Sequence, residues 1–207
     1  MRNFTDTKGK AANVIHFAPL ETTQIKIILK HRGTQRSGLT EIEAWGDTTL
    51  PVKQAPLPAG NLSFNAGNQP FPKASASYTC HFDKVEFAND GIINYNETPN
   101  NRWTSFESKN KTDWLQIDFG AEKKFSRVEL AIYDDHGGVQ APEKYTLEYL
   151  VGDDWKEIPD QTRNPQQPGP GMNTITFAPV LASKMRVVFT HKGQARSGVT
   201  ELMVWEK

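Results

Sequence analysis

A polar, ring-bearing segment at residues 133–140 follows directly on a strongly apolar alternating stretch. A segment in that position emerges at the edge of a sheet, where loops often carry binding sites. Planar donors and acceptors suit pairs of sugar hydroxyls, and a ring can lie against the apolar face of a pyranose. The polar candidates are Asp134, Asp135, His136 and Gln140, and the stacking candidate is Tyr133. The alternative is a solvated loop whose aspartates cap turns and whose Gly137-Gly138 pair makes a tight bend.

A second polar loop, at residues 191–198, carries Arg196. The fork of donors on a guanidinium suits vicinal hydroxyls or the carboxylate of a uronic acid. In the alternative interpretation, Ser197-Gly198 shapes a turn and the arginine pairs with a nearby protein carboxylate. The sequence leaves both interpretations open.

The same loop occurs twice, because residues 13–45 and 173–205 are two copies of one segment. They align without a gap at an offset of 160 residues and share 13 identical positions in 33, among them His31, Arg36 and Ser37 of the first copy. A repeat with this period is a domain-sized unit. We therefore expect the second copy to be the last part of one complete module and the first copy to be the last part of another.

These copies predict three regions along the chain. Residues 61–207 form a complete module, residues 47–60 form a Pro-rich linker, and residues 1–46 are the C-terminal strands of a preceding, incomplete module. The chain then resembles a piece of a larger modular protein. About 45 residues bury too little surface to make a core by themselves. Three ways of stabilising them stay open: a missing half upstream, docking on the complete module, or pairing with another copy.

The elements that must position the two loops are short segments of alternating apolar and polar residues. These segments are residues 24–31, 114–119, 125–133, 145–151 and 184–190, and two further strands are expected near 13–18 and 39–45. A period of two with one polar side is typical of sheets with one buried face. Gly- and Pro-rich punctuation between the segments favours an all-β sandwich.

Composition excludes several classes of partner. Lys plus Arg equals Asp plus Glu at 24 each, so the net charge of zero gives no support for a nucleic-acid or anionic-membrane partner. No apolar run approaches the length of a membrane-spanning helix, and the opening residues have no apolar segment of a signal peptide. Cys80 is the single cysteine, which excludes an internal disulfide and predicts a buried thiol.

Catalysis is not indicated by the residues. A glycosidase needs two carboxylates that face each other across a cleft. Asp134 and Asp135 are adjacent in sequence, so on an extended chain they would point to opposite sides. No nucleophile motif or phosphate-binding loop appears in the sequence. We expect Trp103, Trp114 and Trp155 to pack in or beside the core.

An ordered series of short motifs runs through the second region. The series is Ala74-Ser75-Ala76-Ser77-Tyr78, Asn89-Asp90-Gly91, Arg102-Trp103-Thr104-Ser105, the Trp114–Gly120 strand, Tyr145-Thr146-Leu147-Glu148-Tyr149, Trp155, Arg186-Val187-Val188-Phe189 and Thr200-Glu201-Leu202. Together these motifs resemble the discoidin domains, also called coagulation-factor C-type domains. They look closest to the galactose-binding-like carbohydrate modules attached to bacterial glycoside hydrolases.

The resemblance implies a fold and a set of further site residues. The implied fold is an all-β, eight-stranded antiparallel jelly-roll sandwich, here with an extra N-terminal β-segment. Such modules bind sugars at loops on one rim and lack catalysis of their own, and Arg163 and Asn164 would be further ligand contacts. They often hold a structural calcium ion, for which the matching positions are Ala88, Asp90, Ser105 and Glu201.

The implied function is non-catalytic carbohydrate binding that tethers a secreted polysaccharide-degrading enzyme to its glycan. The partners would be a glycan and a parent glycoside hydrolase domain, without nucleic acid or membrane. The location would be extracellular, periplasmic or at the cell surface. The alternative is a structural or protein-interaction sandwich that braces a glycoside hydrolase catalytic domain, for which an apolar patch on the rim would be the sign.

Overall fold

The computed structural model describes residues 8–17, 25–44, 60–67 and 69–206. The chain divides into two compact units, Met1–Gln54 and Ala55–Lys207. Residues 47–59 of the predicted linker lie outside the described residues. Among the described residues, no helix is long and apolar enough to cross a membrane.

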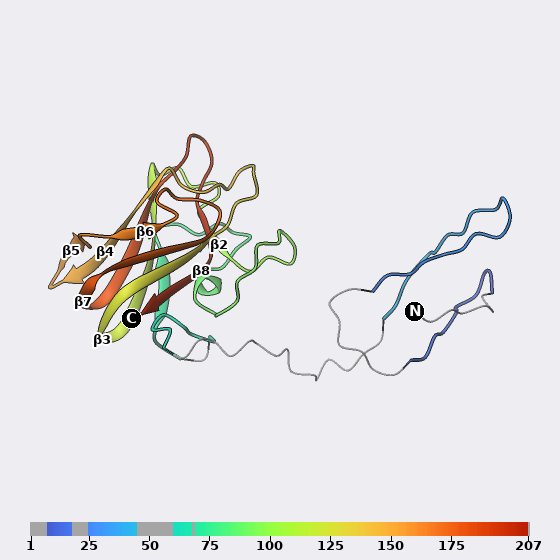
Figure 1. The fold of residues 1–207 in the computed structure, drawn as a ribbon, viewed down its shortest axis with the longest axis horizontal. Coiled ribbons are helices and arrows are strands. Elements are labelled where there is room, and N and C mark those ends of the chain that lie inside the picture. The colour runs from blue at the N-terminus through green and yellow to red at the C-terminus, as the bar shows by residue number, and fades with distance from the viewer. Residues whose placement is uncertain (1–7, 18–24, 45–59, 68, 207) are drawn as a thin grey trace. The chain divides into compact units, whose positions relative to one another are not determined.

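Within its described residues, the C-terminal unit is built from antiparallel strands with one short 3-10 helix (Figure 1). Its elements are β1 (Lys73–Ala76), η1 (Val85–Ala88), β2 (Trp103–Thr104), β3 (Thr112–Ile132), β4 (Lys144–Val151), β5 (Asp154–Glu157), β6 (Thr162–Asn164), β7 (Gly171–Thr190) and β8 (Gly198–Trp205). The strand order is β2-β8-β3-β7-β4-β5, with β1 also paired to β3 and β6 to β7. The predicted all-β antiparallel sandwich is thereby confirmed.

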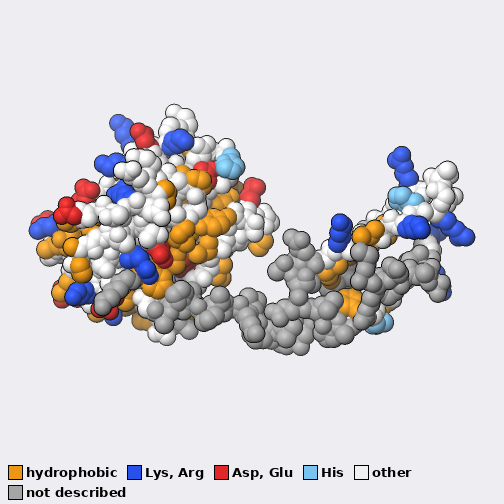
Figure 2. All heavy atoms as spheres, viewed as in Figure 1, with side chains coloured by type: hydrophobic (Ala, Val, Ile, Leu, Met, Phe, Trp, Pro, Cys, Tyr) orange, Lys and Arg blue, Asp and Glu red, His pale blue; other side chains and the backbone are white. Residues whose placement is uncertain are grey.

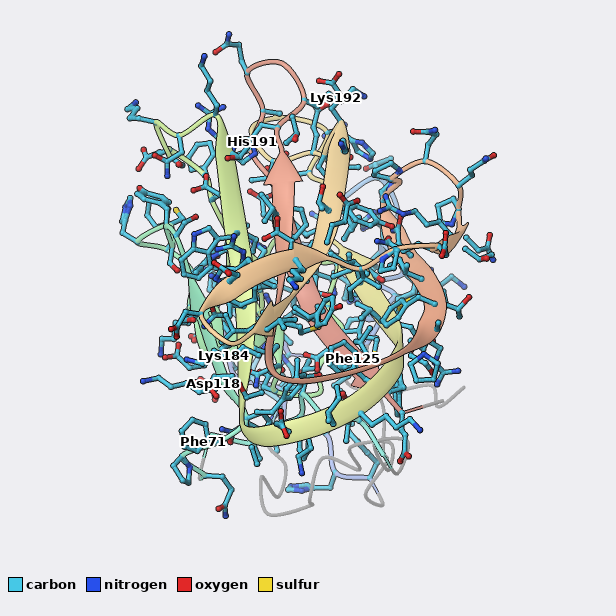
Figure 3. All side chains as sticks on the ribbon, turned by 90° about the vertical axis from the view of Figure 1, so that its left-hand side faces the viewer. Phe71, Asp118, Phe125, Lys184, His191 and Lys192 are labelled. Atoms are coloured by element: carbon cyan, nitrogen blue, oxygen red, sulfur yellow. The ribbon has the colours of Figure 1, made fainter. Side chains whose placement is uncertain are left out.

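Two long strands connect the layers of this sandwich. β3 has 21 residues and β7 has 20, and their mutual register shifts between Asp118 and Lys123 and again between Phe125 and Arg127. Before the shifts β3 pairs with β1, and after them it pairs with β8. Each long strand therefore bends from one layer into the other, as Figure 3 shows beside the labelled Asp118 and Phe125. The two strands expected at 114–119 and 125–133 are one bent strand.

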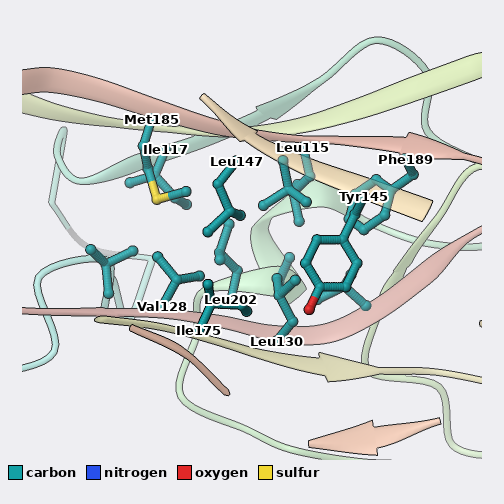
Figure 4. Packing of buried hydrophobic residues seen from close by; sticks show 14 of the residues in the cluster. Leu115, Ile117, Val128, Leu130, Tyr145, Leu147, Ile175, Met185, Phe189 and Leu202 are labelled. Atoms are coloured by element: carbon teal, nitrogen blue, oxygen red, sulfur yellow. The ribbon is translucent and has the colours of Figure 1, made fainter. Parts of the chain in front are cut away.

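The core lies between the two layers (Figure 4). Leu115, Ile117, Leu147, Met185 and Phe189 from one layer face Val128, Leu130, Ile175 and Leu202 from the other, and all of them are fully buried. The alternation of apolar and polar residues produces this arrangement, because successive side chains of a strand point to opposite faces. Trp103 and Cys80 are also buried, as the sequence predicts.

The N-terminal unit differs from the prediction. Strands were expected near residues 13–18, 24–31 and 39–45, yet the described residues 8–17 and 25–44 contain no strand and all of them are exposed. The physical reason is the absence, among these residues, of a facing strand that would satisfy the backbone and cover the apolar side. The expectation of an N-terminal β-segment is therefore wrong for the described residues.

Candidate functional site

Three loops meet at one end of the C-terminal unit. They are residues 105–111 between β2 and β3, residues 133–140 after β3, and residues 191–197 between β7 and β8. Strand register brings them together, because Thr112 at the start of β3 pairs with Thr190, while Ile132 at its end pairs with Val199. Figure 3 shows the His191 and Lys192 loop at one end of the unit and Phe71 at the opposite end. We call the three-loop end the rim.

Backbone hydrogen bonds join the two loops that the sequence singled out. The Arg196 N–H donates to the Gly138 carbonyl at 2.8 Å, and the Gln140 N–H donates to the Arg196 carbonyl at 2.9 Å. Val139 and Arg196 accordingly form a parallel β-bridge. The structure therefore brings Asp134, Asp135, His136, Gln140 and Arg196 into one neighbourhood.

The two aspartates shape the first of these loops. Asp134 accepts hydrogen bonds from the N–H groups of His136 and Ala141 at 2.7 and 3.0 Å. Asp135 Oδ1 accepts from the N–H groups of Gly137 and Val139 at 2.7 and 3.0 Å. This is the turn-forming role that the sequence offered as the alternative. Asp135 Oδ2 receives no hydrogen bond from the described residues, so the exposed oxygen is available to a ligand.

The imidazole of His136 and the amide of Gln140 are the outward groups of the loop. The His136 side chain is 88% exposed, with Nδ1 3.2 Å from Asp134 Oδ1. The Gln140 Nε2 donates to the Gly137 carbonyl at 3.1 Å, and this bond leaves the side-chain oxygen Oε1 for other contacts. His136 has a φ of 60°, and the hydrogen bond from its N–H to Asp134 holds this left-handed conformation.

Tyr133 does not offer a stacking surface. Its side chain is 2% exposed, and the Arg102 guanidinium lies over its ring at 4.2 Å. Burial raises the pKa of the Tyr133 hydroxyl. Arg102 also donates to the carbonyls of Asn96 and Glu97 at 3.3 and 3.1 Å, which fastens the loop before β2 to the rim. The burial of its ring corrects the prediction that Tyr133 stacks on a sugar.

The guanidinium of Arg196 is used largely inside the protein. Its Nε donates to the Ser108 carbonyl at 2.7 Å, and Nη1 donates to the carbonyls of Gln194 and Ala195 at 3.0 and 3.2 Å. These bonds tie the loop at 191–197 to the loop at 105–111. They favour the structural interpretation of Arg196, although through carbonyls rather than through a carboxylate. Nη2 makes no hydrogen bond to the described residues.

Arg163 and Asn164 lie on β6, away from the joined loops. Arg163 stacks over the Tyr145 ring at 4.6 Å and donates to the Tyr145 carbonyl and to Gln161 Oε1. It lines an open hollow of about 410 Å³ with Glu157, Ile158, Pro159, Asp160 and Gln161. No described contact joins Arg163 or Asn164 to residues 133–140, so these two are not brought together with the other sugar-binding candidates.

Phe106 is a ring at the rim that sequence reasoning missed. It is 36% exposed, and a Cβ placed on Gly138 would lie 2.5 Å from its Cε2 atom, so the ring packs against the bare backbone of that glycine. Its neighbour Glu107 lies 3.5 Å from His81, whose ring stacks on Phe82, itself 65% exposed. The signal in the sequence is an aromatic residue directly after the Arg102–Ser105 motif, in the loop between two strands.

A second polar cluster surrounds Glu201 on β8. This carboxyl is fully buried, and Oε1 accepts a hydrogen bond from the Gly91 N–H at 3.1 Å. Burial, and next the charge of Asp90, raises the pKa of Glu201 to about 9. Burial also raises the pKa of Asp90, whose Oδ2 accepts from Asn101 Nδ2 at 2.8 Å. Asp90 and Glu201 therefore lie close together, a question that the sequence left open, and Asp90 follows the buried Ala88 by two residues.

Two buried oxygens in this cluster have no partner among the described residues. Glu201 Oε2 and Asn101 Oδ1 are both enclosed and receive no hydrogen bond from that part of the chain. Buried polar atoms are nearly always paired, so an oxygen-lined site with two unpaired acceptors fits a bound cation. Carboxylate, amide and carbonyl oxygens are the ligands that calcium prefers. No group of three His, Cys, Asp or Glu side chains gathers in the described part of the chain, so amide and backbone oxygens would have to complete the set.

Ser105 is misplaced in the predicted ligand set. Its N–H donates to the Ser197 carbonyl at 2.9 Å, and its hydroxyl lies 3.3 Å from the same carbonyl. Ser197 precedes Glu201 by four residues, which is about 13 Å along an extended strand. The register that pairs Trp103 with Val199 instead carries Asn101 toward Glu201. Asn101 therefore replaces Ser105 as the candidate ligand.

A buried hydrogen-bonded chain supports the rim from below. His191 Nδ1 lies 3.1 Å from the Ser197 hydroxyl, and His191 Nε2 lies 3.0 Å from Asp113 Oδ2. Burial alone would raise the pKa of Asp113, but hydrogen bonds from His191, Asn110, Ser77 and Ser108 lower it below its ordinary value. All three residues are enclosed, so the Ser197 hydroxyl has no access to a substrate. The chain of hydrogen bonds fixes the loop between β7 and β8.

Comparisons with known proteins agree with this fold. Residues 87–187 match the family model of the F5/F8 type C domain, described as a NedA-like, galactose-binding domain. Bovine lactadherin is 26% identical over 160 residues, which make up 74% of this chain and 35% of lactadherin. This chain therefore spans 35% of the length of that curated relative.

Several solved structures share the fold. A chain from the β-galactosidase BgaA of Streptococcus pneumoniae superposes with a TM-score of 0.66 at 24% identity, covering 71% of this chain and 98% of that chain. Chitosan-binding module 1 from a chitosanase/glucanase of Paenibacillus sp. IK-5 gives 0.51 at 22% identity, covering 70% and 98%. The family 32 carbohydrate-binding module of C. perfringens NanJ, solved in complex with galactose, gives 0.53 at 20% identity, covering 65% and 93%.

The family match lies wholly within the second unit, over the segment that contains β2 to β6, the end of η1 and most of β7. The structural neighbours extend the likeness to most of that unit, and their identities below 25% make it a likeness of fold. The C-terminal unit of this chain has the fold of the discoidin-like, F5/F8 type C domains, whose family model matches it over residues 87–187.

Proposed function

We propose that the C-terminal unit binds carbohydrate at the rim, without catalysis of its own. The observation that carries this proposal is the pair of backbone hydrogen bonds that join Gly138, Gln140 and Arg196. Through them, an exposed imidazole, a free carboxylate oxygen and a side-chain amide stand on one surface beside the exposed ring of Phe106. Polar groups next to an aromatic ring are what recognition of a pyranose requires.

In this proposal Phe106 takes the stacking role once expected of Tyr133. The polar contacts come from Asp135 Oδ2, His136 and Gln140, while Asp134, Tyr133 and Arg196 hold the loops in position. A rim of this kind buries little of a ligand, so the affinity of one module is modest. Several structural neighbours are carbohydrate-binding modules, one of them solved with galactose and one with chitotriose, which supports the same class of ligand.

The biological role that we propose is tethering. A module of this kind, attached to a secreted polysaccharide-degrading enzyme, keeps that enzyme close to its glycan and raises the effective concentration of substrate. The location would then be extracellular, periplasmic or at the surface of a bacterial cell. The parent glycoside hydrolase domain and the glycan would be the partners, with no nucleic acid or membrane involved.

We further propose that Asp90, Glu201 and Asn101, with the Ala88 carbonyl, hold a structural calcium ion. The unpaired oxygens of Glu201 and Asn101 support this assignment. A cation there would neutralise the buried carboxyl of Glu201 and connect β8 to the turn at Asp90-Gly91. Its contribution is to the stability of the loop before β2, and no step of ligand binding passes through it.

The test of carbohydrate binding is isothermal titration calorimetry against galactose, N-acetylglucosamine and chitotriose. We expect binding constants on the order of millimolar for at least one sugar, and losses of roughly tenfold or more for Phe106→Ala and His136→Ala. Lys156→Ala, an exposed change on β5, serves as the matched control and should bind as the natural chain does. No binding of any sugar at several times this concentration contradicts the proposal.

A protein-docking surface is the second candidate, and one observation favours it. Exposed apolar side chains occur in the loops on either side of β2, namely Phe82, Ile92, Ile93 and Tyr95 before it and Phe106 after it. Figure 2 shows hydrophobic side chains on the face of the unit where these loops lie in Figure 1. Such a patch suits a brace against a catalytic domain. In the same calorimetric test, Ile92→Ser with Ile93→Ser leaves sugar binding unchanged if the rim alone binds sugar.

A further inference from the structure

The repeated segment occurs in the structure once as a packed pair of strands and once without strands. β7 and β8 contain Met185, Val187, Phe189, Val199 and Leu202, which are fully buried in the core. Their counterparts 160 residues earlier are apolar as well, yet all are exposed. These counterparts are Ile25, Ile27, Leu29, Leu39 and Ile42, with exposures from 40% to 61%. The first copy thus carries the apolar pattern of a core strand pair without a core.

The difference lies in what each copy pairs with. β7 and β8 both form antiparallel ladders with β3, and β7 also pairs with β4. Residues 25–44 form no strand in the described structure. Strands are stabilised by backbone pairing and by cover of one face, and a lone hairpin has neither in sufficient amount. The first copy therefore requires an equivalent of β3 and of the layer behind it.

A second, polar contact identifies that missing partner more closely. His31 Nδ1 lies 3.1 Å from the Ser37 hydroxyl, the same distance that separates His191 Nδ1 from the Ser197 hydroxyl. In the C-terminal unit the other ring nitrogen of the histidine lies 3.0 Å from Asp113 at the start of β3. In the described part of the chain, His31 pairs with no acidic side chain and is exposed. The first copy therefore keeps the contact between histidine and serine. Among the described residues, it lacks an aspartate like the one that the histidine contacts in the C-terminal unit.

We propose that residues 25–44 bind a polypeptide equivalent to residues 61–172 and with it complete a second domain of the same fold. The partner has a long bent strand with an alternating apolar face, as in β3, and an aspartate at its start that receives His31. An apolar surface alone would not qualify as this partner, because its aspartate must stand at a fixed position relative to its apolar face. Residues 13–17 would form the first strand of the same element, since Ile15 and Phe17 correspond to the buried Ile175 and Phe177.

The test is a chimera of the full chain in which residues 25–42 replace residues 185–202. If the two copies are structurally equivalent, the transplanted segment finds β3, β4 and Asp113 in place. We expect one cooperative thermal transition at a lower midpoint than in the natural chain. We also expect the amides of the transplanted segment to exchange at least about 100-fold more slowly than those of residues 25–42 at their natural position.

Two matched variants make the result specific. Ile27→Asp should abolish the cooperative transition of the chimera when placed in the transplanted segment, and should leave the natural chain unchanged when made at its original position. His31→Ala in the transplanted segment should lower the midpoint about as much as His191→Ala does in the natural chain. If instead the chimera tolerates Ile27→Asp, the segment is not packing as β7 does and the proposal is wrong.

A shorter exchange covers the case in which the full chimera does not fold. Residues 25–31 then replace residues 185–191 only, so that β8 and its loop stay natural. Cooperative unfolding with protected amides in the exchanged strand supports the proposal. If neither chimera unfolds cooperatively, the two copies are not interchangeable and the proposal is overturned.

Discussion

His191 Nε2 lies 3.0 Å from Asp113 Oδ2 in the interior of the C-terminal unit, directly beneath the proposed binding rim. The pair connects the start of β3 to the loop between β7 and β8. Ser77 and Asn110 also donate to Asp113, at 2.7 and 2.8 Å, so the carboxylate has several partners at once. The position of the rim loops therefore depends on a charge that is buried and fully hydrogen-bonded.

Removing one member of this pair should destabilise the unit strongly. Asp113→Ala leaves the buried His191 without its hydrogen-bond partner, and a buried polar group left unsatisfied in this way costs roughly 1–3 kcal/mol. Chemical denaturation monitored by tryptophan fluorescence measures the loss. Lys156→Ala, at an exposed position of β5, should change the free energy of unfolding by less than about 0.5 kcal/mol. A loss equally small for Asp113→Ala contradicts the role assigned to the pair.

The same carboxyl predicts a dependence of stability on acid. The pKa of Asp113 is lower in the folded state than in the unfolded chain, so folding favours the ionised form. Its contribution is present above the unfolded pKa of about 4 and is lost as the pH falls below it. Thermal unfolding between pH 7 and pH 3 should show this loss. Asp113→Asn should flatten the pH dependence, and an unchanged slope in that variant would assign the effect to other groups.

The proposed cation site predicts that chelation weakens the fold. Because the ion binds the native state and not the unfolded chain, adding calcium after EDTA treatment should raise the melting temperature by several degrees. Glu201→Gln and Asn101→Ala should remove most of this rise. Ser105→Ala should retain it, since Ser105 lies against Ser197 and outside the site. A melting temperature that is unaffected by EDTA rules out a structural calcium ion here.

Gly138 should be sensitive to the smallest possible side chain. A Cβ at this position meets the Phe106 ring at 2.5 Å, so Gly138→Ala must displace the ring from the rim. We expect sugar binding to fall by roughly tenfold, in line with the loss of one stacking contact. Gly137→Ala is the matched control, because its nearest contact is Asp135 Oδ1 at an ordinary 3.4 Å. Equal effects of the two changes would separate Phe106 from binding.

The sequence predicted most of the fold because alternation reports burial directly. Leu115, Ile117, Val128 and Leu130 all face the core as their spacing indicates. The bend that makes one strand of two segments was missed, since Gly120 was interpreted as the end of a strand. The N-terminal strands were missed for a different reason. The alternation at Ile25, Ile27 and Leu29 shows that this segment has an apolar face. It does not show whether the described residues include a second layer on which that face can pack.

The candidate site was predicted less fully than the fold. The sequence predicted which residues belong to the two loops. The residues concerned do lie at one end of the unit: Asp134, Asp135, His136, Gln140 and Arg196. The direction of a side chain was not visible, and for that reason Tyr133 was expected outside and lies within. The cation ligands depend on strand register, which pairs Ser105 with Ser197 and brings Asn101 toward Glu201. Strand register depends on how distant segments of the chain pair, and short sequence motifs do not reveal that pairing.

Carbohydrate binding at the rim is measured residue by residue in a heteronuclear NMR titration of the full chain with galactose and with chitotriose. We expect one of these ligands to shift the backbone amides of Phe106, His136 and Gln140 at concentrations on the order of millimolar, while the amides of β5 and of residues 25–44 stay in place. Shifts confined to the apolar loops around Ile92 and Tyr95, or to the hollow beside Arg163, would contradict it.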